Sequence, residues 1–250
     1  MNSTTLQQYR NTHKWMIIPW IIIIIGFTPQ YFMSWLSEPW GYHLHALSAM
    51  AWYALMVSQP YLATHGKLGS HRLWGMVGIF IAGAVVFSAL SIVPTNVYFG
   101  AIGGFEPVLP ASFFYGLVFT ESLQIIGFGF AVIMAIINAK KPNQHAIWML
   151  STLFFGLMPG WVRLIMFPIL ITGESGGLNV QICLNVGIPI FVLAVLIVGY
   201  RLKKLKHPAI ILSIILVILM LFTLVIGEQE EYQEMVTRVM KPTVPWKIDG

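Results

Sequence analysis

Seven long apolar stretches dominate the chain, and short polar segments separate them. They run from Trp15 to Leu36, His43 to Ala63, Leu73 to Val93, Phe113 to Ile137, Ala146 to Ile171, Leu178 to Tyr200 and Pro208 to Gly227. Each is about 20 residues or longer, and at about 1.5 Å per residue such a helix spans a hydrocarbon layer roughly 30 Å thick. The pattern predicts an all-α integral membrane bundle of seven transmembrane helices.

The basic residues of the loops indicate which side of the membrane each loop occupies. They stand in four groups: Arg10 and Lys14; Lys67 and Arg72; Lys140 and Lys141; and Arg201, Lys203, Lys204 and Lys206. The intervening loops contain Glu38, Glu106 and Glu174, and neither Lys nor Arg. Because short basic loops resist translocation, we expect a cytoplasmic N-terminus and an external C-terminus. The expected location is the cell (cytoplasmic or inner) membrane, with the lipid bilayer as partner.

Composition supports this assignment, because 57% of the residues are hydrophobic and only 9% are charged, against about a quarter charged in soluble domains. The net charge of +5 is spread over four segments, so no nucleic-acid partner is expected. We divide the chain into a cytoplasmic arm (1–14), a transmembrane domain (15–227) and an external acidic tail (228–250). The functional core is expected in spans two to five, about residues 43–171.

Three local features refine the organisation. Pro29 predicts a bend near the outer end of the first span. The external loop from Pro94 to Pro110 is long and apolar, and either folds back over the bundle as a lid or stays irregular. The tail either forms an amphipathic helix or is disordered; the apolar positions of that helix would be Met235, Val236, Val239 and Met240.

Strongly polar residues inside spans are costly and are therefore functional candidates. In the second span one helical face carries His45, Trp52, Met56 and Gln59, and in the fifth span one stripe carries His145, Thr152, Gly156 and Arg163. The fourth span carries Glu121 and Gln124 one turn apart.

Glu121 and Arg163 reach a similar depth in the outer half of the membrane, and we expect them to pair because an isolated charge there is expensive. Two interpretations follow. The pair either fixes helix packing alone, or it lines an outward-facing pocket with His45, Gln59 and Gln124. Such a pocket could bind a quinone head group or relay protons.

A second group of candidates lies at the cytoplasmic end. His71 opens the third span and His145 opens the fifth, so both imidazoles lie at one level and could ligate a haem b iron from opposite sides. Arg72 is available for a propionate, and His65 is a further candidate for the same cofactor site. Alternatively, these histidines simply hydrogen-bond at the membrane interface. A zinc site of His43, His45 and Glu121 is a third possibility.

The motifs around these residues resemble a bacterial family. The strings are His45-Ala46-Leu47 with Trp52, Gln59-Pro60 with Leu62, His71-Arg72-Leu73 with Gly75, and His145-Ala146-Ile147-Trp148-Met149-Leu150 with Arg163. Together, over about residues 40–165, they resemble the polytopic membrane proteins catalogued as domain of unknown function 2306. This resemblance implies a helical membrane protein with histidines at helix ends, and it implies no reaction.

A looser similarity is to cytochrome b561-type electron carriers, in which paired histidines hold haem at each membrane face. His71 and His145 match one such pair. His45 lacks the histidine partner that the other pair would need in the fourth span, where Glu121 and Gln124 stand instead. The similarity therefore implies one haem at most.

Three functions remain open from the sequence. The first is a haem-binding redox protein, a membrane oxidoreductase that exchanges electrons with quinone or a membrane redox partner. The second is a metal-free small-molecule transporter or sensor with a pocket of Glu121, Arg163 and His45. The third is a membrane assembly subunit.

Overall fold

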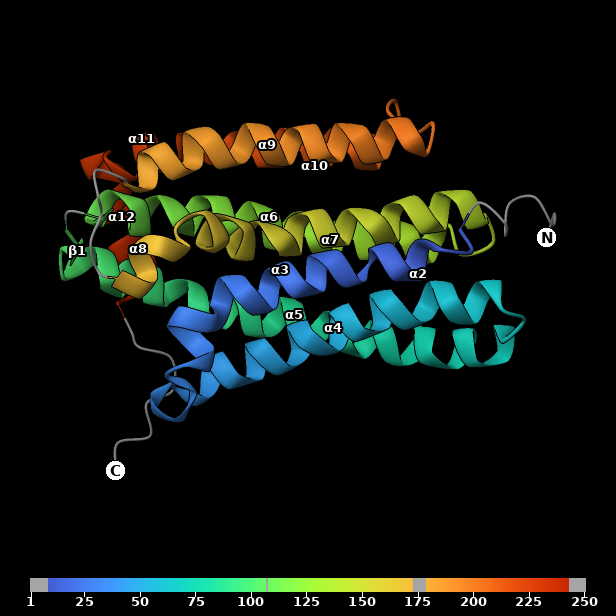
Figure 1. Ribbon diagram of the computed structural model, residues 1–250. Helices are drawn as coiled ribbons and strands as arrows, with labels where there is room; N and C mark the ends of the chain where they lie inside the picture. The colour runs from blue at the N-terminus through green and yellow to red at the C-terminus, as the bar shows by residue number, and fades with distance from the viewer. Residues whose placement is uncertain (1–8, 107, 173–178, 243–250) are drawn as a thin grey trace.

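The computed structural model describes residues 9–106, 108–172 and 179–242, and most of them are helical (Figure 1). The first segment combines α2 (Thr12–Trp15), α3 (Ile17–Phe27) and the π-helical turn η1 (Thr28–Phe32). The next long helices are α4 (Trp40–Thr64), α5 (Leu68–Ala101), α6 (Ala111–Ile137) and α7 (Pro142–Ile165). The short α8 (Phe167–Thr172), α9 (Val180–Arg201) and α10 (Pro208–Leu219) follow. The predicted all-α class is confirmed.

Six helical segments of the described chain are long and apolar enough to cross a membrane: Thr12–Phe32, Leu68–Ala101, Ala111–Ile137, Pro142–Ile165, Val180–Arg201 and Pro208–Gly227. Helix α4 has 25 residues and runs alongside α5, but it is less apolar because it contains His43, His45 and Gln59 (Figure 1). Large apolar side chains such as Phe80 and Phe87 face outward, 80% and 61% exposed. These features fit a multi-pass membrane protein, and the seventh span stays a prediction.

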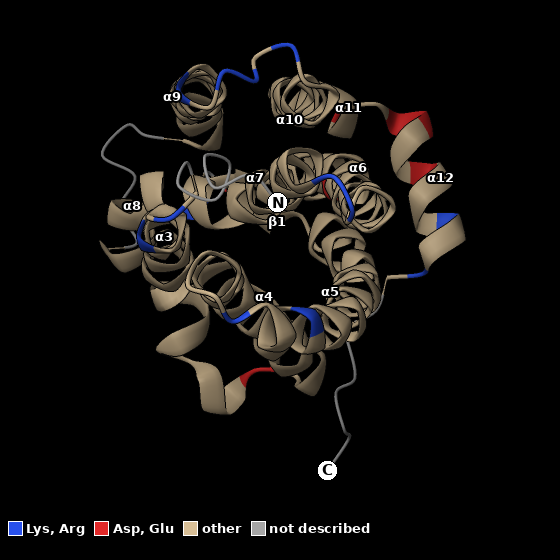
Figure 2. Cartoon of the chain, turned by 90° about the vertical axis from the view of Figure 1, so that its right-hand side faces the viewer, with Lys and Arg blue, Asp and Glu red and all other residues tan. Residues whose placement is uncertain are grey.

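The long helices form two layers when viewed along the bundle (Figure 2). Helices α3 to α7 surround a common centre, and α9 and α10 pack on the outside of α6 and α7. The outer layer continues from α10 through the 3-10 turn η3 (Met220–Phe222) into α11 (Thr223–Gly227). Gly116 and Gly227 let α6 and α11 meet backbone to backbone, since a Cβ at either would collide with a carbonyl of the other helix.

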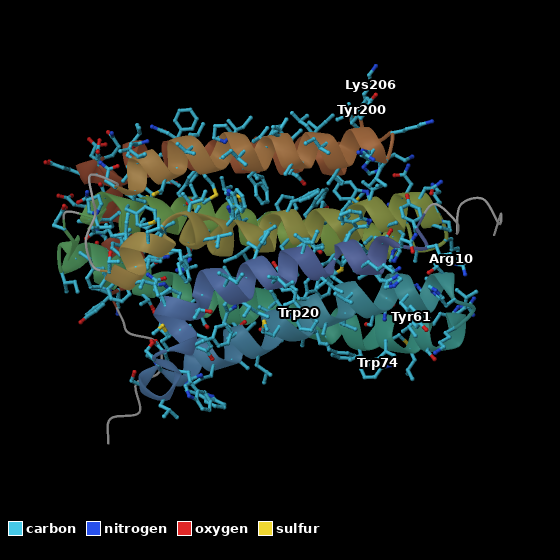
Figure 3. The ribbon with its side chains drawn as sticks, in the orientation of Figure 1. Arg10, Trp20, Tyr61, Trp74, Tyr200 and Lys206 are labelled. Carbon is cyan, nitrogen blue, oxygen red and sulfur yellow. The ribbon has the colours of Figure 1, made fainter. Side chains whose placement is uncertain are left out.

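Most of the Lys and Arg residues of the described chain lie in connections at one end of the bundle, which we call the basic end, and a few lie on or beside α12 (Glu230–Met240) (Figure 2). The basic end is formed by the α4–α5, α6–α7 and α9–α10 connections. Arg10, Tyr61, Trp74 and Lys206 lie at this end (Figure 3). Trp20 lies near mid-length instead and donates to Met50 Sδ at 3.4 Å (Figure 3).

The connection after α5 differs from the predicted loop. Helix α5 continues to Ala101 with Pro94 inside it, so only the last part of the Pro94–Pro110 segment leaves the helix. There, β1 (Gly104–Phe105) and β2 (Leu109–Pro110) form a short antiparallel hairpin, and Gly104, where the chain enters β1, has a φ of +71°. The expected boundary was wrong because proline ends helices in water, whereas a membrane helix packed among neighbours tolerates it.

Short helical segments connect α3 to α4 and follow α11. After Phe27 the first segment becomes π-helical at Pro29, which agrees with the predicted bend, and the 3-10 turn η2 (Trp35–Ser37) leads into α4. The tail forms α12 (Glu230–Met240), so the helical alternative is the one observed. Val236 is buried against the bundle, while Val239 is 73% exposed.

Candidate functional site

A cavity of about 520 Å³ lies among α3 to α7, in the half of the bundle opposite the basic end. Most of its lining is aliphatic and aromatic, including Phe27, Trp52, Phe99, Phe114, Phe128 and Phe155. A few polar side chains converge on it: Gln30, Tyr42, His45, Asn96, Glu121, Gln124 and Arg163. Size and composition are those of a site for a small molecule with an apolar body.

Two glycines bring the first segment to the cavity wall. A Cβ at Gly26 would collide with the carbonyl of Gly160, and a Cβ at Gly160 would lie 2.6 Å from Ile23 Cδ1. Helices α3 and α7 therefore cross in backbone contact, which places Gln30 of η1 beside Arg163. The first segment thus lines the cavity in addition to spans two to five.

Arg163 is held from three sides. Its Nε donates to Gln30 Oε1 at 2.6 Å, and its Nη1 donates to the Pro159 carbonyl at 3.1 Å. The guanidinium carbon lies 4.4 Å from the centre of the Phe27 ring, a cation–π contact. These contacts fix the plane of the guanidinium, and no described residue accepts from Nη2, which is left to donate to a ligand.

Glu121 has a different partner from the one expected. Its Oε2 accepts from Asn96 Nδ2 at 2.7 Å, and the structure contains no salt bridge between Glu121 and Arg163. The predicted direct pair is therefore wrong, although both side chains line the same cavity and their charges still interact across it. The amide of Asn96 binds Glu121 and the amide of Gln30 binds Arg163, in place of the expected direct contact. Space therefore remains between the two charged groups.

His45 is anchored to the neighbouring helix α5. Its Nδ1 lies 3.1 Å from Ser88 Oγ, and Ser88 Oγ in turn lies 2.6 Å from the Ala84 carbonyl. Ser48 Oγ is a third member of this chain, 3.1 Å from Ser88 Oγ. The imidazole is therefore held at Nδ1, and His45 is among the residues that line the cavity.

The two predicted helical stripes face each other across the bundle. Trp52 Nε1 of α4 donates to Thr152 Oγ1 of α7 at 3.2 Å, and both residues line the cavity. Tyr53, also on α4, is 3% exposed, lines the cavity and has no hydrogen-bond partner for its hydroxyl. Gln124 donates to Met220 Sδ at 2.7 Å, a weak acceptor. The side chains of Tyr53 and Gln124 thus line the cavity without using all of their hydrogen-bonding capacity.

The hairpin between α5 and α6 contributes to the far end of the cavity. Phe105 of β1 and Leu109 of β2 are among the lining residues, and the Phe105 ring contacts Phe99 and Phe114 at centroid distances of 5.3 and 5.7 Å. The loop therefore folds back over the bundle, as the lid alternative proposed.

The histidine pair of the basic end is also brought together. The rings of His71 and His145 lie 6.3 Å apart, centre to centre, at 89° to each other. His145 Nδ1 lies 2.9 Å from the Ala135 carbonyl, which can only accept, so the proton is on Nδ1 and the lone pair is on Nε2. His71 Nδ1 is buried without a partner.

The remaining candidates near this pair have varied surroundings. Gln59 is 9% exposed, and neither its amide nitrogen nor its oxygen has a partner; it is the one predicted pocket residue that does not line the cavity. His65 stacks on Tyr61 at 4.2 Å and contacts neither member of the histidine pair. Arg72 is exposed beside His71.

The histidines His43 and His45 do not converge. His43 Nδ1 is 2.7 Å from the Tyr31 hydroxyl, whereas His45 is bonded to Ser88. Over the described ranges, no three His, Cys, Asp or Glu side chains are placed to hold a metal ion together. The zinc site of His43, His45 and Glu121 is thus not formed, because the two histidines lie on different helical faces.

One further histidine caps α10 at the basic end. His207 Nδ1 accepts from the Ala209 backbone N–H at 3.2 Å, so Nε2 carries the proton and donates to Gln144 Oε1. Burial, together with the charge of Lys204, lowers the pKa of His207. His207 is not among the candidates that the sequence pattern indicated.

No family model matches the chain, and no curated protein or solved structure matches it. The resemblance to domain of unknown function 2306 and the looser similarity to b561-type carriers stay predictions.

Several residues that line the cavity, and Ser88 behind His45, were missed from the sequence. Asn96 fell in the supposed loop after Pro94, and Gln30 followed Pro29 at the end of the first span. Ser88 and Tyr53 carry no charge, and each looked like an ordinary helix residue. A helix continued through Pro94 would have placed Asn96 near the depth of Glu121, which is the signal that could have found it.

Proposed function

We propose that the protein binds a small amphipathic molecule with a planar polar ring, of the quinone class, in the cavity between α3 and α7. The observation that carries this proposal is the cavity itself, in which Arg163, Glu121 and His45 converge within aromatic walls. Flat rings stack favourably on such walls. Since the cavity lies in apolar helices, its ligand would arrive through the bilayer, as expected of a transporter or sensor.

The polar groups fit a neutral head group better than a strong anion. Arg163 brings one positive charge, but Glu121 and Glu38 also line the cavity. A carboxylate or phosphate would therefore meet two acidic side chains as well as one positive charge. A carbonyl or hydroxyl oxygen can accept from Arg163 Nη2 without that repulsion.

Direct binding tests the proposal on the purified full chain in detergent. We expect decyl-benzoquinone to bind the wild type in calorimetry, and Arg163→Gln to weaken binding about tenfold or more, as loss of a charged hydrogen bond does. Arg72→Gln, at the exposed position by His71, is the matched control and should bind normally. Tyr53→Phe tests the cavity with less risk to folding. No binding by the wild type, or equal binding by Arg163→Gln, would overturn the proposal and favour an assembly subunit.

A second candidate function, haem binding for electron transfer, is favoured by one observation, the contact between His71 and His145. Metal–nitrogen bonds are about 2.0 Å long, so two rings 6.3 Å apart are within reach of one iron between them. The hydrogen bond from His145 Nδ1 to Ala135 is the support that ligating histidines usually have. A bound haem would supply one-electron transfer, with Arg72 near enough in sequence to pair with a propionate. A colourless protein after expression with haem precursor removes this candidate.

We also infer that α4 is the seventh span and that the basic end is cytoplasmic. Helix α4 has 25 residues, a length close to the 27 of α6 and the 24 of α7, and the basic connections gather at one end of the bundle (Figure 2). Reporter fusions after Glu38 and after Lys67, which bracket α4, should then report the external and the cytoplasmic side respectively. The same side for both would contradict the topology.

A further inference from the structure

The hydrogen-bond chain behind His45 determines what the cavity offers to its ligand. Ser88 Oγ carries one hydrogen, and its shortest acceptor is the Ala84 carbonyl at 2.6 Å. That hydrogen is therefore used within α5, and Ser88 Oγ can only accept from His45 Nδ1 at 3.1 Å. Ser48 is consistent with this order, because it donates either to the His45 carbonyl at 3.0 Å or to Ser88.

These hydrogen bonds leave His45 as an acceptor toward the cavity. With its proton on Nδ1, the neutral imidazole has its free lone pair on Nε2. No described residue donates to Nε2, and His45 lines the cavity. A lone pair in this position requires a ligand with a hydrogen-bond donor, because an unpaired acceptor in a buried site is costly.

Arg163 and Tyr53 also have groups that can form hydrogen bonds with a ligand in the cavity. Arg163 Nη2 can only donate, and the unpartnered hydroxyl of Tyr53 can donate or accept. A quinone has carbonyl oxygens alone and satisfies Arg163 and Tyr53 but not His45. A hydroquinone has hydroxyl groups that both donate and accept, so it satisfies all three.

We propose that the cavity selects the reduced, hydroxyl-bearing form of a lipophilic quinone, because Ser88 fixes His45 as an acceptor. This inference rests on the proposed binding function and names its ligand more narrowly. In it, His45 contacts the ligand, and Ser88, which does not line the cavity, is a positioning residue.

Binding of three related probes under anaerobic conditions tests the proposal: decyl-hydroquinone, decyl-benzoquinone and the dimethyl ether of the hydroquinone. We expect the wild type to bind the hydroquinone roughly tenfold tighter than the quinone, which is the effect of one hydrogen bond. The ether keeps the ring and removes both donors, so it should bind no better than the quinone.

Ser88→Ala separates this proposal from a merely structural role. Without Ser88 the imidazole is free to place its proton on Nε2, so the preference for the hydroquinone should fall to within about twofold. Ser91→Ala is the matched control: Ser91 lies one turn along α5, donates to the Ser88 carbonyl at 2.7 Å and does not line the cavity. It should keep the wild-type preference.

The outcomes distinguish the two proposals. If no probe binds, the proposed function fails. If the quinone binds as well as the hydroquinone, or if Ser88→Ala keeps the full preference at unchanged thermal stability, only the inference about the reduced ligand is overturned.

Discussion

The cavity and the histidine pair share helices α5 and α7, yet they satisfy their polar groups in opposite ways. Arg163 and His145 are both on α7, about 27 Å apart by helical rise. At the cavity, Arg163, Glu121 and His45 each have a protein partner and a side that faces open volume. At the basic end, the rings of the pair are in contact, while Gln59 and His71 have buried atoms with no partner.

This difference shows that one sequence signal, a polar residue within an apolar helix, has two physical outcomes. Where neighbouring helices are held apart by large aromatic side chains, polar groups pair sideways and leave room for a ligand. Where the helices pack closely, the same groups form a buried cluster in which some polar atoms have no partner. Such a cluster lowers the stability of the fold unless a bound molecule or ion supplies the missing partners. The cavity therefore gives the stronger functional argument.

The largest expected effect comes from destroying the wall of the cavity. Gly26→Val forces a side chain into the Gly160 carbonyl, so α3 must move away from α7 and Gln30 must leave Arg163. We expect unfolding to become easier by about 1–3 kcal/mol, as for other overpacked sites, and quinone-class binding to be lost. Gly75→Val, where a Cβ meets nothing within 4 Å, is the control. Thermal unfolding in detergent with and without ligand measures both, and equal stability of the two variants would refute the close crossing.

An intermediate effect of opposite sign is expected at the basic end. Gln59→Leu replaces an unpaired buried amide with an apolar group of similar size, and should raise the free energy of unfolding by about 1–3 kcal/mol. The same change at Gln124 removes a bond to Met220 inside the cavity and should give no gain. Chemical unfolding of both variants makes the comparison. A loss of stability in Gln59→Leu would instead mean that the amide has a partner, such as a bound ion or water.

The smallest effect concerns pH. The pKa of His207 is lowered in the folded protein, so the unfolded chain binds the proton more readily as pH falls below about 6.5. Its contribution to stability is therefore complete near pH 7.5 and is lost progressively toward pH 5. His207→Gln should flatten this part of the pH profile of thermal unfolding, and His65→Gln, at an exposed position, should not. Ligand binding at the cavity should be unaffected by either variant, and a change there would break the separation of the two regions.

The apolar stretches were enough to predict most of the fold, and helical periodicity predicted which residues of α4 and α7 face inward. Trp52 and Thr152, chosen from those two stripes, are hydrogen-bonded to each other. The meeting of His71 and His145 was also predictable, since each histidine stands at the start of a span that begins on the same side of the membrane. The end of α5 and the partners of Glu121 and Arg163 were not predictable, because each depends on how neighbouring helices pack around a proline or an amide.

Hydrophobicity and charge, read along the chain, determined that this protein is a helical membrane bundle with its basic loops at one end. Those properties are local, since each helix must satisfy its own backbone and bury or expose its own side chains in lipid. Only the tertiary structure decided that Glu121 is hydrogen-bonded to Asn96, that Arg163 is hydrogen-bonded to Gln30, and that a cavity stays open between them. Such choices depend on contacts between helices, where a single glycine crossing sets which side chains can reach one another.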